Sequence, residues 1–277
     1  YWQNYSMGAM LQDDGSFKID IPEQAKNSER SFIRVFAYNK AGEGNDLLIP
    51  LENGKPINNA HQLTRHDKEA YILYFMMVDR FFNGDPENDE PVSDPDVAYR
   101  ANYQGGDLRG IYEKVKSGYF SDLGINTIWI SPIVQNPLTA YKEWPAPHRK
   151  FSGYHGYWPI SSTKIDHRFG TPQVLNELID GAHQNDMNII LDFVANHVHE
   201  EHPMIKANPD WKTHLDLPDG TKNIRIWEEQ RLTTWFDTFL PSLDFSRDDV
   251  IQTQVDSALF WVENYDLDGF RHDATKH

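Results

Sequence analysis

The chain has 277 residues, which is enough for one large or two medium-sized domains. Its formal net charge is −16, from 26 Lys and Arg against 42 Asp and Glu, and it has no basic run, so nucleic acid is an improbable partner. It contains no cysteine and no apolar run of about 18 residues, which excludes disulfides, thiol chemistry and a membrane-spanning helix.

We expect the chain to be truncated at both ends. It starts at Tyr1 rather than Met, and it stops at His277 directly after an expected strand. The missing signal peptide therefore says little about the compartment.

The first 58 residues favour β structure. Turns rich in Asn, Gly and Asp separate three expected strands, at 16–21, 31–39 and 47–51. So few strands cannot close a sandwich, and we expect residues 1–58 to be part of a β-sandwich module. The polar residues 59–69 are expected to form a linker.

From residue 70 the pattern alternates between strands and helices. The expected strands are apolar runs at 71–78, 125–130, 188–194 and 266–271. Expected helices cover 108–122, begin at Thr171-Pro172, and begin at Ser246 with Asp249 completing a capping box. A long excursion at 197–245 interrupts the alternation. The fold class is α/β, either half of a (β/α)₈ barrel or an open doubly wound sheet. No Gly-rich phosphate loop follows the first strand, which disfavours a nucleotide-binding sheet.

Polar residues gather at the carboxyl ends of the expected strands, where the active site of such a barrel lies. Arg271 and Asp273 are two residues apart on a strand and therefore point the same way. A guanidinium beside a carboxylate keeps it ionised, as a nucleophilic Asp requires. The alternative is a purely structural ion pair.

Three further segments are candidates for a site. Asn196-His197 follows Asp192 on an emerging loop, with an imidazole that can donate to a hydroxyl and an amide oxygen that suits Ca²⁺. The aromatic residues of 154–158 could stack on a sugar or pack on the rim of the barrel. The loops 83–89 and 105–107 carry closely spaced oxygen ligands typical of a Ca²⁺ site, although an acidic surface turn has the same composition.

Taken together, these segments resemble the α-amylase family of glycoside hydrolases, in its neopullulanase and cyclomaltodextrinase-like branch. The resemblance covers residues 70–277. It is carried by DRFFNGD (79–85) with GGDLRGI (105–111), YHGYW (154–158), DFVANH (192–197), LPSLD (240–244) and GFRHDATKH (269–277), in the order of the family's signatures. It implies the N-terminal half of a (β/α)₈ TIM barrel, strands 1–4, with 197–245 as domain B.

The resemblance also implies roles for individual residues. Asp273 would be the nucleophile, held by Arg271, while Asp192 would be structural and pair with Arg271. The implied substrate-binding residues are His155, Tyr157, His197, Lys276 and His277. The implied calcium ligands are Asn83, Asp85, Asn88, Asp89, Gly105 and Asp107, with Asn196 a weaker candidate.

The activity implied by the resemblance is retaining hydrolysis of an α-glucan through a covalent glycosyl-Asp intermediate. The acid/base Glu and a second Asp of the family's pattern would fall beyond His277, so we expect residues 1–277 alone to be inactive and poorly folded. An inactive glucan-binding remnant and a transglycosylase are the alternatives. The resemblance favours a secreted or periplasmic location; the sequence leaves open the bond preference, the preferred glucan and the oligomeric state.

Overall fold

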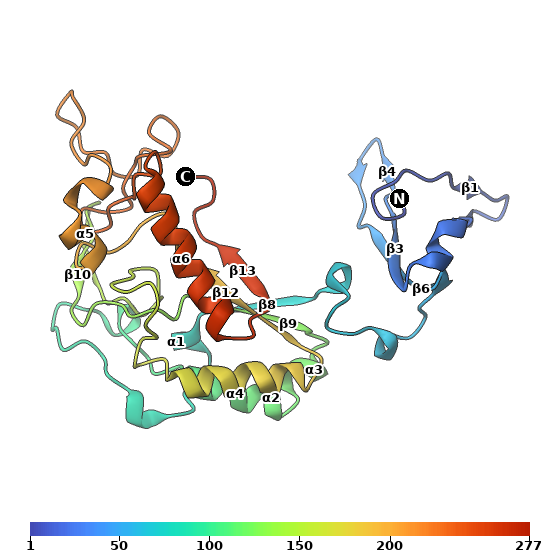
Figure 1. Ribbon diagram of the computed structural model, residues 1–277, viewed down its shortest axis with the longest axis horizontal. Coiled ribbons are helices and arrows are strands. Elements are labelled where there is room, and N and C mark those ends of the chain that lie inside the picture. The colour runs from blue at the N-terminus through green and yellow to red at the C-terminus, as the bar shows by residue number, and fades with distance from the viewer. The chain divides into compact units, whose positions relative to one another are not determined.

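A computed structural model describes residues 1–277 except for the side chain of Leu11, and the chain divides into two compact units, Tyr1–Ile72 and Leu73–His277 (Figure 1). Each unit has its own buried cluster. In the first unit the cluster is centred on Ala25, Ile33 and Leu51.

The first unit is made of short antiparallel strands. A three-stranded sheet has the order β3-β6-β7, and two further pairs are β1-β2 and β4-β5. The strands are β1 (Met10–Leu11), β2 (Phe17–Lys18), β3 (Arg30–Val35), β4 (Tyr38–Asn39), β5 (Gly42–Glu43), β6 (Leu47–Glu52) and β7 (Lys55–Pro56). The 3₁₀ turns are η1 (Glu23–Asn27), η2 (Ala60–Gln62) and η3 (Lys68–Ala70). Turn η2 falls in the expected linker, and η3 ends one residue beyond it.

The second unit is built on a parallel sheet with the order β13-β12-β9-β8. These strands are β8 (Leu73–Met76), β9 (Thr127–Ile130), β12 (Asn188–Phe193) and β13 (Gly269–His272), and β10 (Tyr141–Lys142) pairs separately with β11 (Lys150–Phe151). The helices are α1 (Val78–Phe81), α2 (Leu108–Lys116), α3 (Tyr119–Asp122), α4 (Pro172–His183), α5 (Pro203–Ala207) and α6 (Asp248–Asn264). Its 3₁₀ turns are η4 (Pro86–Asn88), η5 (Tyr99–Ala101) and η6 (Pro209–Trp211).

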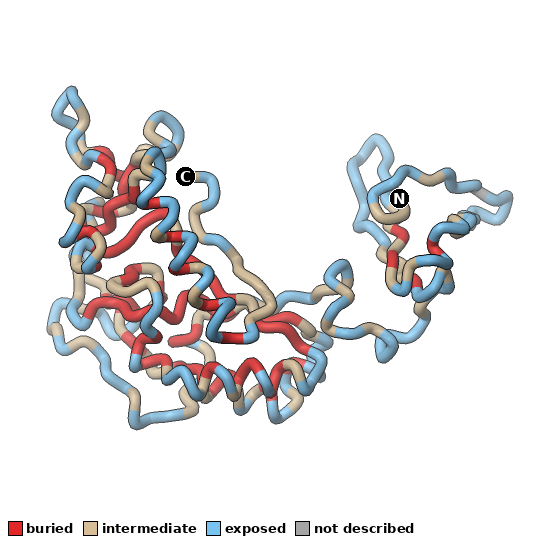
Figure 2. The backbone as a smooth tube through the Cα atoms, viewed as in Figure 1, coloured by how far each residue is buried: buried red, intermediate tan, exposed pale blue. Residues whose placement is uncertain are grey.

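One face of the parallel sheet is apolar and buried, and the other includes charged residues. On one face Ile128, Ile130, Ile189 and Leu191 are buried in the main core with the inner sides of α2 and α4 (Figure 2). The register of the strands places Phe75, Trp129, Asp192 and Arg271 on the other face. Asp192 and Arg271 are the last residues of that face on β12 and β13, so they lie at the carboxyl ends of these strands.

The start of α4 follows from its sequence. Thr171 is the N-cap, its hydroxyl accepts from the backbone N–H of Val174 at 3.3 Å, and Pro172 occupies the first turn. Leu175, Leu178 and Ala182 lie buried at helical spacing, as expected. The helix expected over 108–122 is instead two helices, because Gly118 adopts φ 80° between α2 and α3.

The capping box expected at Ser246 is wrong. Helix α6 begins at Asp248 with Arg247 at the N-cap position and no side-chain cap. The Ser246 hydroxyl donates instead to Asp244 at 2.6 Å, and Asp249 pairs with Arg247 at 2.9 Å. Asp248 and Asp249 still favour the helix start because they lie near the positive end of the helix dipole.

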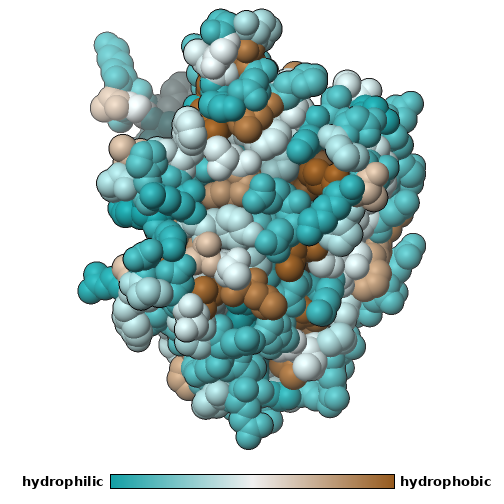
Figure 3. Space-filling model, turned by 90° about the vertical axis from the view of Figure 1, so that its left-hand side faces the viewer, coloured by the Kyte–Doolittle hydropathy of each residue, from teal (hydrophilic) through white to brown (hydrophobic). Residues whose placement is uncertain are grey.

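One face of the surface is largely polar. Figure 3 shows hydrophilic residues over most of one face, with hydrophobic residues in small separate groups. Among the described residues, no helix is long and apolar enough to cross a membrane.

The close contact between α2 and the loop after α1 generates a first prediction. A Cβ on Gly110 would lie 2.0 Å from the Phe82 carbonyl oxygen and 2.7 Å from its carbon. In an open helix Gly→Ala stabilises by about 1 kcal/mol, but here we expect Gly110→Ala to destabilise by about 2 kcal/mol because backbone must move. Urea unfolding measures this. Gly269→Ala is the matched control because its Cβ would meet nothing within 4 Å; equal effects of the two substitutions would contradict the prediction.

Candidate active site

Arg271 links two carboxylates at the carboxyl end of the parallel sheet. Its Nη1 donates to Asp273 Oδ1 at 2.7 Å and to the two oxygens of Asp192 at 3.0 and 3.1 Å. The contact with Asp192 follows from the register, which pairs Asp192 with Arg271 on adjacent strands. The Asp273 side chain is 18% exposed, so its carboxylate remains accessible from outside.

Asp192 is the buried anchor of this group. Its side chain has no exposed surface, and it accepts from the Tyr157 hydroxyl at 2.8 Å and the Trp129 Nε1 at 3.1 Å besides Arg271. Burial raises the pKa of Asp192, while hydrogen bonds from Tyr157 and Arg271 act in the opposite direction. Burial, followed by the charge of Asp192, raises the pKa of Tyr157, so Tyr157 acts as a neutral hydroxyl donor.

Trp129 is a residue of this group that the sequence interpretation missed. The Arg271 guanidinium lies 4.9 Å from the centre of its ring, and the Phe75 ring packs at 4.3 Å. The expected strand at 125–130 includes Trp129, and its side chains alternate between the two faces of the sheet. An apolar sequence does not indicate which of these faces carries the site.

His197 lies against the segment that carries Tyr157. Its Nε2 is 3.1 Å from the Tyr157 carbonyl oxygen, so Nε2 carries the hydrogen, and its ring stacks on Phe236 at 4.4 Å. Burial lowers the pKa of His197. Its Nδ1 is buried and has no hydrogen-bond partner in the described part of the chain. A neutral imidazole in this state offers one remaining acceptor.

His155 completes the aromatic segment before the site. Its Nδ1 accepts from the Tyr157 backbone N–H at 3.0 Å, and burial lowers its pKa to about 3. Trp158 is only 9% exposed and packs on Phe239 at 4.9 Å, so Trp158 belongs to the core rather than to an open platform. Tyr154 packs under the Arg80 guanidinium at 3.9 Å.

Lys276 and His277 contact the long excursion. Lys276 Nζ lies 2.7 Å from Glu228, and the His277 ring lies 5.0 Å from that of Trp227. Trp227 and Phe236 were not predicted as neighbours of the site residues. A single aromatic residue in a long loop has no periodic pattern from which its contacts could be inferred.

Asn196 faces the segment 240–244. Its Nδ2 donates to the Ser242 hydroxyl at 3.2 Å, and that hydroxyl donates to the Thr234 carbonyl at 2.6 Å. These neutral contacts tie the end of the excursion to the loop after β12.

The loops 83–89 and 105–107 bring oxygen atoms together as the sequence suggested. The Oδ1 atoms of Asn83 and Asn88 are buried without a partner among the described residues. Asp89 lies beside them, with both oxygens 2.9 Å from Asn83 Nδ2. Gly105 has φ +87°, and a Cβ there would lie 2.3 Å from Asp89 Oδ1. Unpaired amide oxygens beside a carboxylate fit a hard cation such as Ca²⁺.

Two of the expected calcium ligands already have backbone partners. Asp107 caps α2 by accepting from the Gly110 N–H at 2.6 Å and also accepts from the Asp85 N–H at 2.8 Å. Asp85 accepts from the Glu87 N–H at 3.2 Å. The described residues contain no cluster of three or more His, Cys, Asp or Glu side chains suited to a metal, so amide and backbone oxygens would have to supply much of the coordination.

The chain was compared with known proteins. Residues 75–277 match the family model of the alpha-amylase catalytic domain. The chain is 32% identical over 230 residues to a cyclomaltodextrin glucanotransferase of Klebsiella oxytoca, a match covering 76% of this chain and 33% of that protein. It is 30% identical over 229 residues to an intracellular maltogenic amylase of Bacillus subtilis, covering 74% and 33%. These matches span about a third of the length of the curated relatives.

A solved structure shows the same likeness. The α-amylase of Geobacillus thermoleovorans, complexed with acarbose, superposes with a TM-score of 0.58 at 35% identity, covering 75% of this chain and 40% of that one.

A buried imidazole in the excursion generates a second prediction. Burial lowers the pKa of His202 to about 4, against about 6.5 in an unfolded chain. Unfolding therefore takes up a proton as the pH falls from 6.5 to 4, and stability is lost over that window. His202 also caps α5 through Nδ1, which Asn can replace.

We expect His202→Asn to reduce the loss of unfolding free energy between pH 7 and pH 4.5 by about 2 kcal/mol. Urea unfolding at the two pH values measures the loss. His148→Asn, the same substitution at an exposed position, is the control. A His202→Asn variant with the parent's pH dependence would contradict the buried, neutral imidazole.

Proposed function

Since this chain belongs to the α-amylase family of glycoside hydrolases, we propose that the protein cleaves α-glucosidic bonds of an α-glucan with retention, using Asp273 as nucleophile. The observation that carries the proposal is the position of Asp273: partly exposed at the end of β13 and 2.7 Å from Arg271. The hydrogen bond from Arg271 holds the carboxylate in a fixed orientation for attack.

The proposed reaction has two steps. The Asp273 carboxylate attacks the anomeric carbon, a bond from carbon to its oxygen forms, and the glycosidic bond breaks while a second carboxyl group protonates the leaving oxygen. Water, activated by the same second group, then hydrolyses the glycosyl-Asp ester. Asp192 and Trp129 hold Arg271 in place, and Tyr157, His155 and His197 line the sugar.

The fold supports the same proposal. We propose that β8, β9, β12 and β13 form part of a (β/α)₈ barrel with the site at its carboxyl end and the excursion as domain B. Transfer to a sugar acceptor is the second candidate, favoured by the likeness to a cyclomaltodextrin glucanotransferase. Transfer and hydrolysis share Asp273 and differ in what attacks the intermediate.

Covalent trapping tests the nucleophile. A glucosyl fluoride carrying a second ring fluorine, which slows breakdown, should label the protein because fluoride leaves without protonation. Mass spectrometry should find one fluoroglucosyl group on Asp273. Asp273→Asn should take no label. In a protein that includes the second carboxyl group, this substitution should lower hydrolysis of maltodextrin by at least about 10³-fold.

The matched control for trapping is Asp266→Asn, since Asp266 has a side chain 82% exposed and lies before β13. It should label like the parent. Labelling of a residue other than Asp273, or normal hydrolysis by Asp273→Asn, would overturn the assignment.

A calcium ion at the loop 83–89 is part of the proposal. Asn83 and Asn88 would supply their unpaired Oδ1 atoms, with Asp89 and the Gly105 carbonyl beside them, and the ion would fix this loop to α2. Asp85 and Asp107 stay in the proposed ligand set and would keep their backbone hydrogen bonds.

Calcium binding should increase the free energy of unfolding. At a concentration 100 times its dissociation constant, Ca²⁺ should raise the unfolding free energy by about 2.7 kcal/mol, and a chelator should reverse this. Asp89→Asn should abolish the effect, whereas Glu87→Gln in the same loop should keep it. An equal response of all three proteins to Ca²⁺ would exclude this site.

A further inference from the structure

Arg168 forms the floor of a surface pocket that the proposed reaction does not use. The pocket has a volume of about 280 Å³ and is lined by Arg168 with Glu90–Asp94 and Leu138–Ala140. Arg168 is 3% exposed, whereas most of the lining is exposed, so the guanidinium lies at the bottom of an open hollow. A volume near the lower end of ligand pockets, about 300 Å³, suits a ligand of one sugar ring.

Two of the three guanidinium nitrogens of Arg168, Nε and Nη2, are held by hydrogen bonds within the protein. Nε and Nη2 bind Asp166 at 2.8 and 2.7 Å, and Nη2 also donates to the carbonyl oxygens of Asn136 and Pro137 at 3.1 and 3.3 Å. The face of the guanidinium lies 3.9 Å from the centre of the Tyr103 ring. The arginine is therefore rigid.

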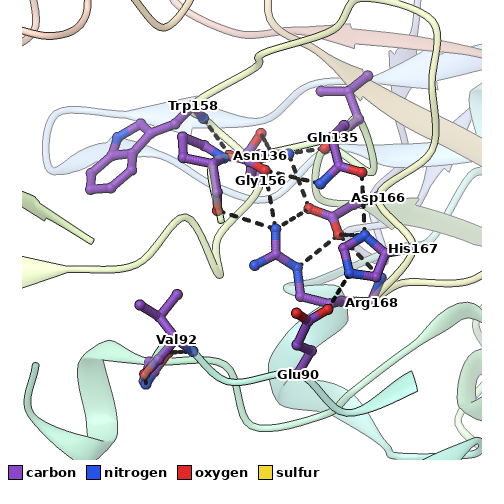
Figure 4. Close-up of polar contacts among 12 residues, drawn as sticks. Glu90, Val92, Gln135, Asn136, Gly156, Trp158, Asp166, His167 and Arg168 are labelled. Atoms are coloured by element: carbon purple, nitrogen blue, oxygen red, sulfur yellow. Dashed lines mark hydrogen bonds and ion pairs between the residues drawn. The ribbon is translucent and has the colours of Figure 1, made fainter. Parts of the chain in front are cut away.

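One nitrogen of Arg168 is left over. In Figure 4, Nη1 carries no dashed line and points away from Asp166. It has no protein partner in the described part of the chain, and it is not among the fully buried unpaired atoms, so it keeps some exposed surface. Because Arg168 lines the pocket, we infer that this exposed nitrogen is turned toward it. An immobilised guanidinium in the lining of a pocket, with one N–H group unpaired, can donate to a ligand there.

The charges around the pocket indicate the kind of ligand. Asp166 neutralises Arg168, Lys150 neutralises Asp94 at 3.0 Å, and Glu90 carries an accepting carboxylate at the rim beside His167. An anion would meet the carboxylate of Glu90 and a guanidinium already neutralised by Asp166, which disfavours an anionic ligand. A hydroxyl group can accept from Nη1 and donate to Glu90, and Pro91, Val92 and Leu138 offer apolar contact.

We propose that this pocket binds a glucosyl unit of an α-glucan, as a second sugar site apart from Asp273. The choice of glucose rests on the proposed function, whereas the hydroxyl chemistry rests on the pocket. Asn136 connects the two places: its carbonyl accepts from Arg168, and its side chain binds the Gly156 carbonyl at 3.1 Å and the Trp158 N–H at 2.8 Å. The second site and the Tyr157 segment thus share one rigid support (Figure 4).

The test avoids Arg168 itself, since removing it would leave Asp166 buried and unpaired and could unfold the protein. Ser93→Trp fills the pocket from an exposed position, and exposed Ser121→Trp on α3 is the matched control. Glu90→Gln keeps the shape and removes the accepting charge. Hydrogen exchange followed by mass spectrometry, with maltotriose as the probe, reports residues 90–94 and 138–140 separately from 154–158.

Maltotriose should slow exchange at 90–94 and 138–140 in the parent and in Ser121→Trp, but not in Ser93→Trp. Glu90→Gln should need about tenfold more maltotriose for the same protection. Protection of these segments by inorganic phosphate but not by maltotriose would overturn the proposal, as would unchanged protection in Ser93→Trp.

The two proposals fail in different ways. Protection at 154–158 without protection at 90–94 would refute the second site and leave the α-glucan function standing. Protection at 90–94 alone would support the pocket and count against the proposed substrate at Asp273.

Discussion

The arrangement of the site depends on one buried charge, the carboxylate of Asp192. It lies on a central strand with no exposed surface, and its neutralisation comes from Arg271 on the adjacent strand. A buried charge is tolerated only when it is paired and hydrogen-bonded, and Asp192 gathers Arg271, Tyr157 and Trp129 for this reason. Three segments are thereby oriented toward Asp273 at once.

In the loops around the sheet, too, single buried polar side chains bind more than one segment. Asp107 caps α2 and also accepts from the loop before it, while Asn136 binds both the Tyr157 segment and Arg168. Buried polar side chains that serve two loops fix the loops relative to the sheet without a large apolar interface. The candidate calcium loop and the proposed second sugar site both rest on such residues.

The features that could be predicted from the sequence are those determined by a few neighbouring residues. The alternation of apolar strands and helices, the Thr171-Pro172 helix start and the order of the motifs along the chain all follow from patterns within a few residues. The break at Gly118 was missed because an isolated Gly is tolerated in a helix, and the Ser246 cap was wrong because Asp244 competes for its hydroxyl. The part played by Trp129, Phe236 and Arg168 could not be predicted, since it depends on contacts between segments far apart in the sequence.

The partners of Asp192 also bear on how the molecule is made. Tyr157, Trp129 and Arg271 lie 35, 63 and 79 residues away from it along the chain. Such separations impose a large loop-closure cost before any contact forms, so these hydrogen bonds assemble late in folding. During synthesis Tyr157 and Trp129 precede Asp192, whereas Arg271 follows it by 79 residues. The charged partner of the buried carboxylate therefore becomes available only with the fourth strand of the sheet.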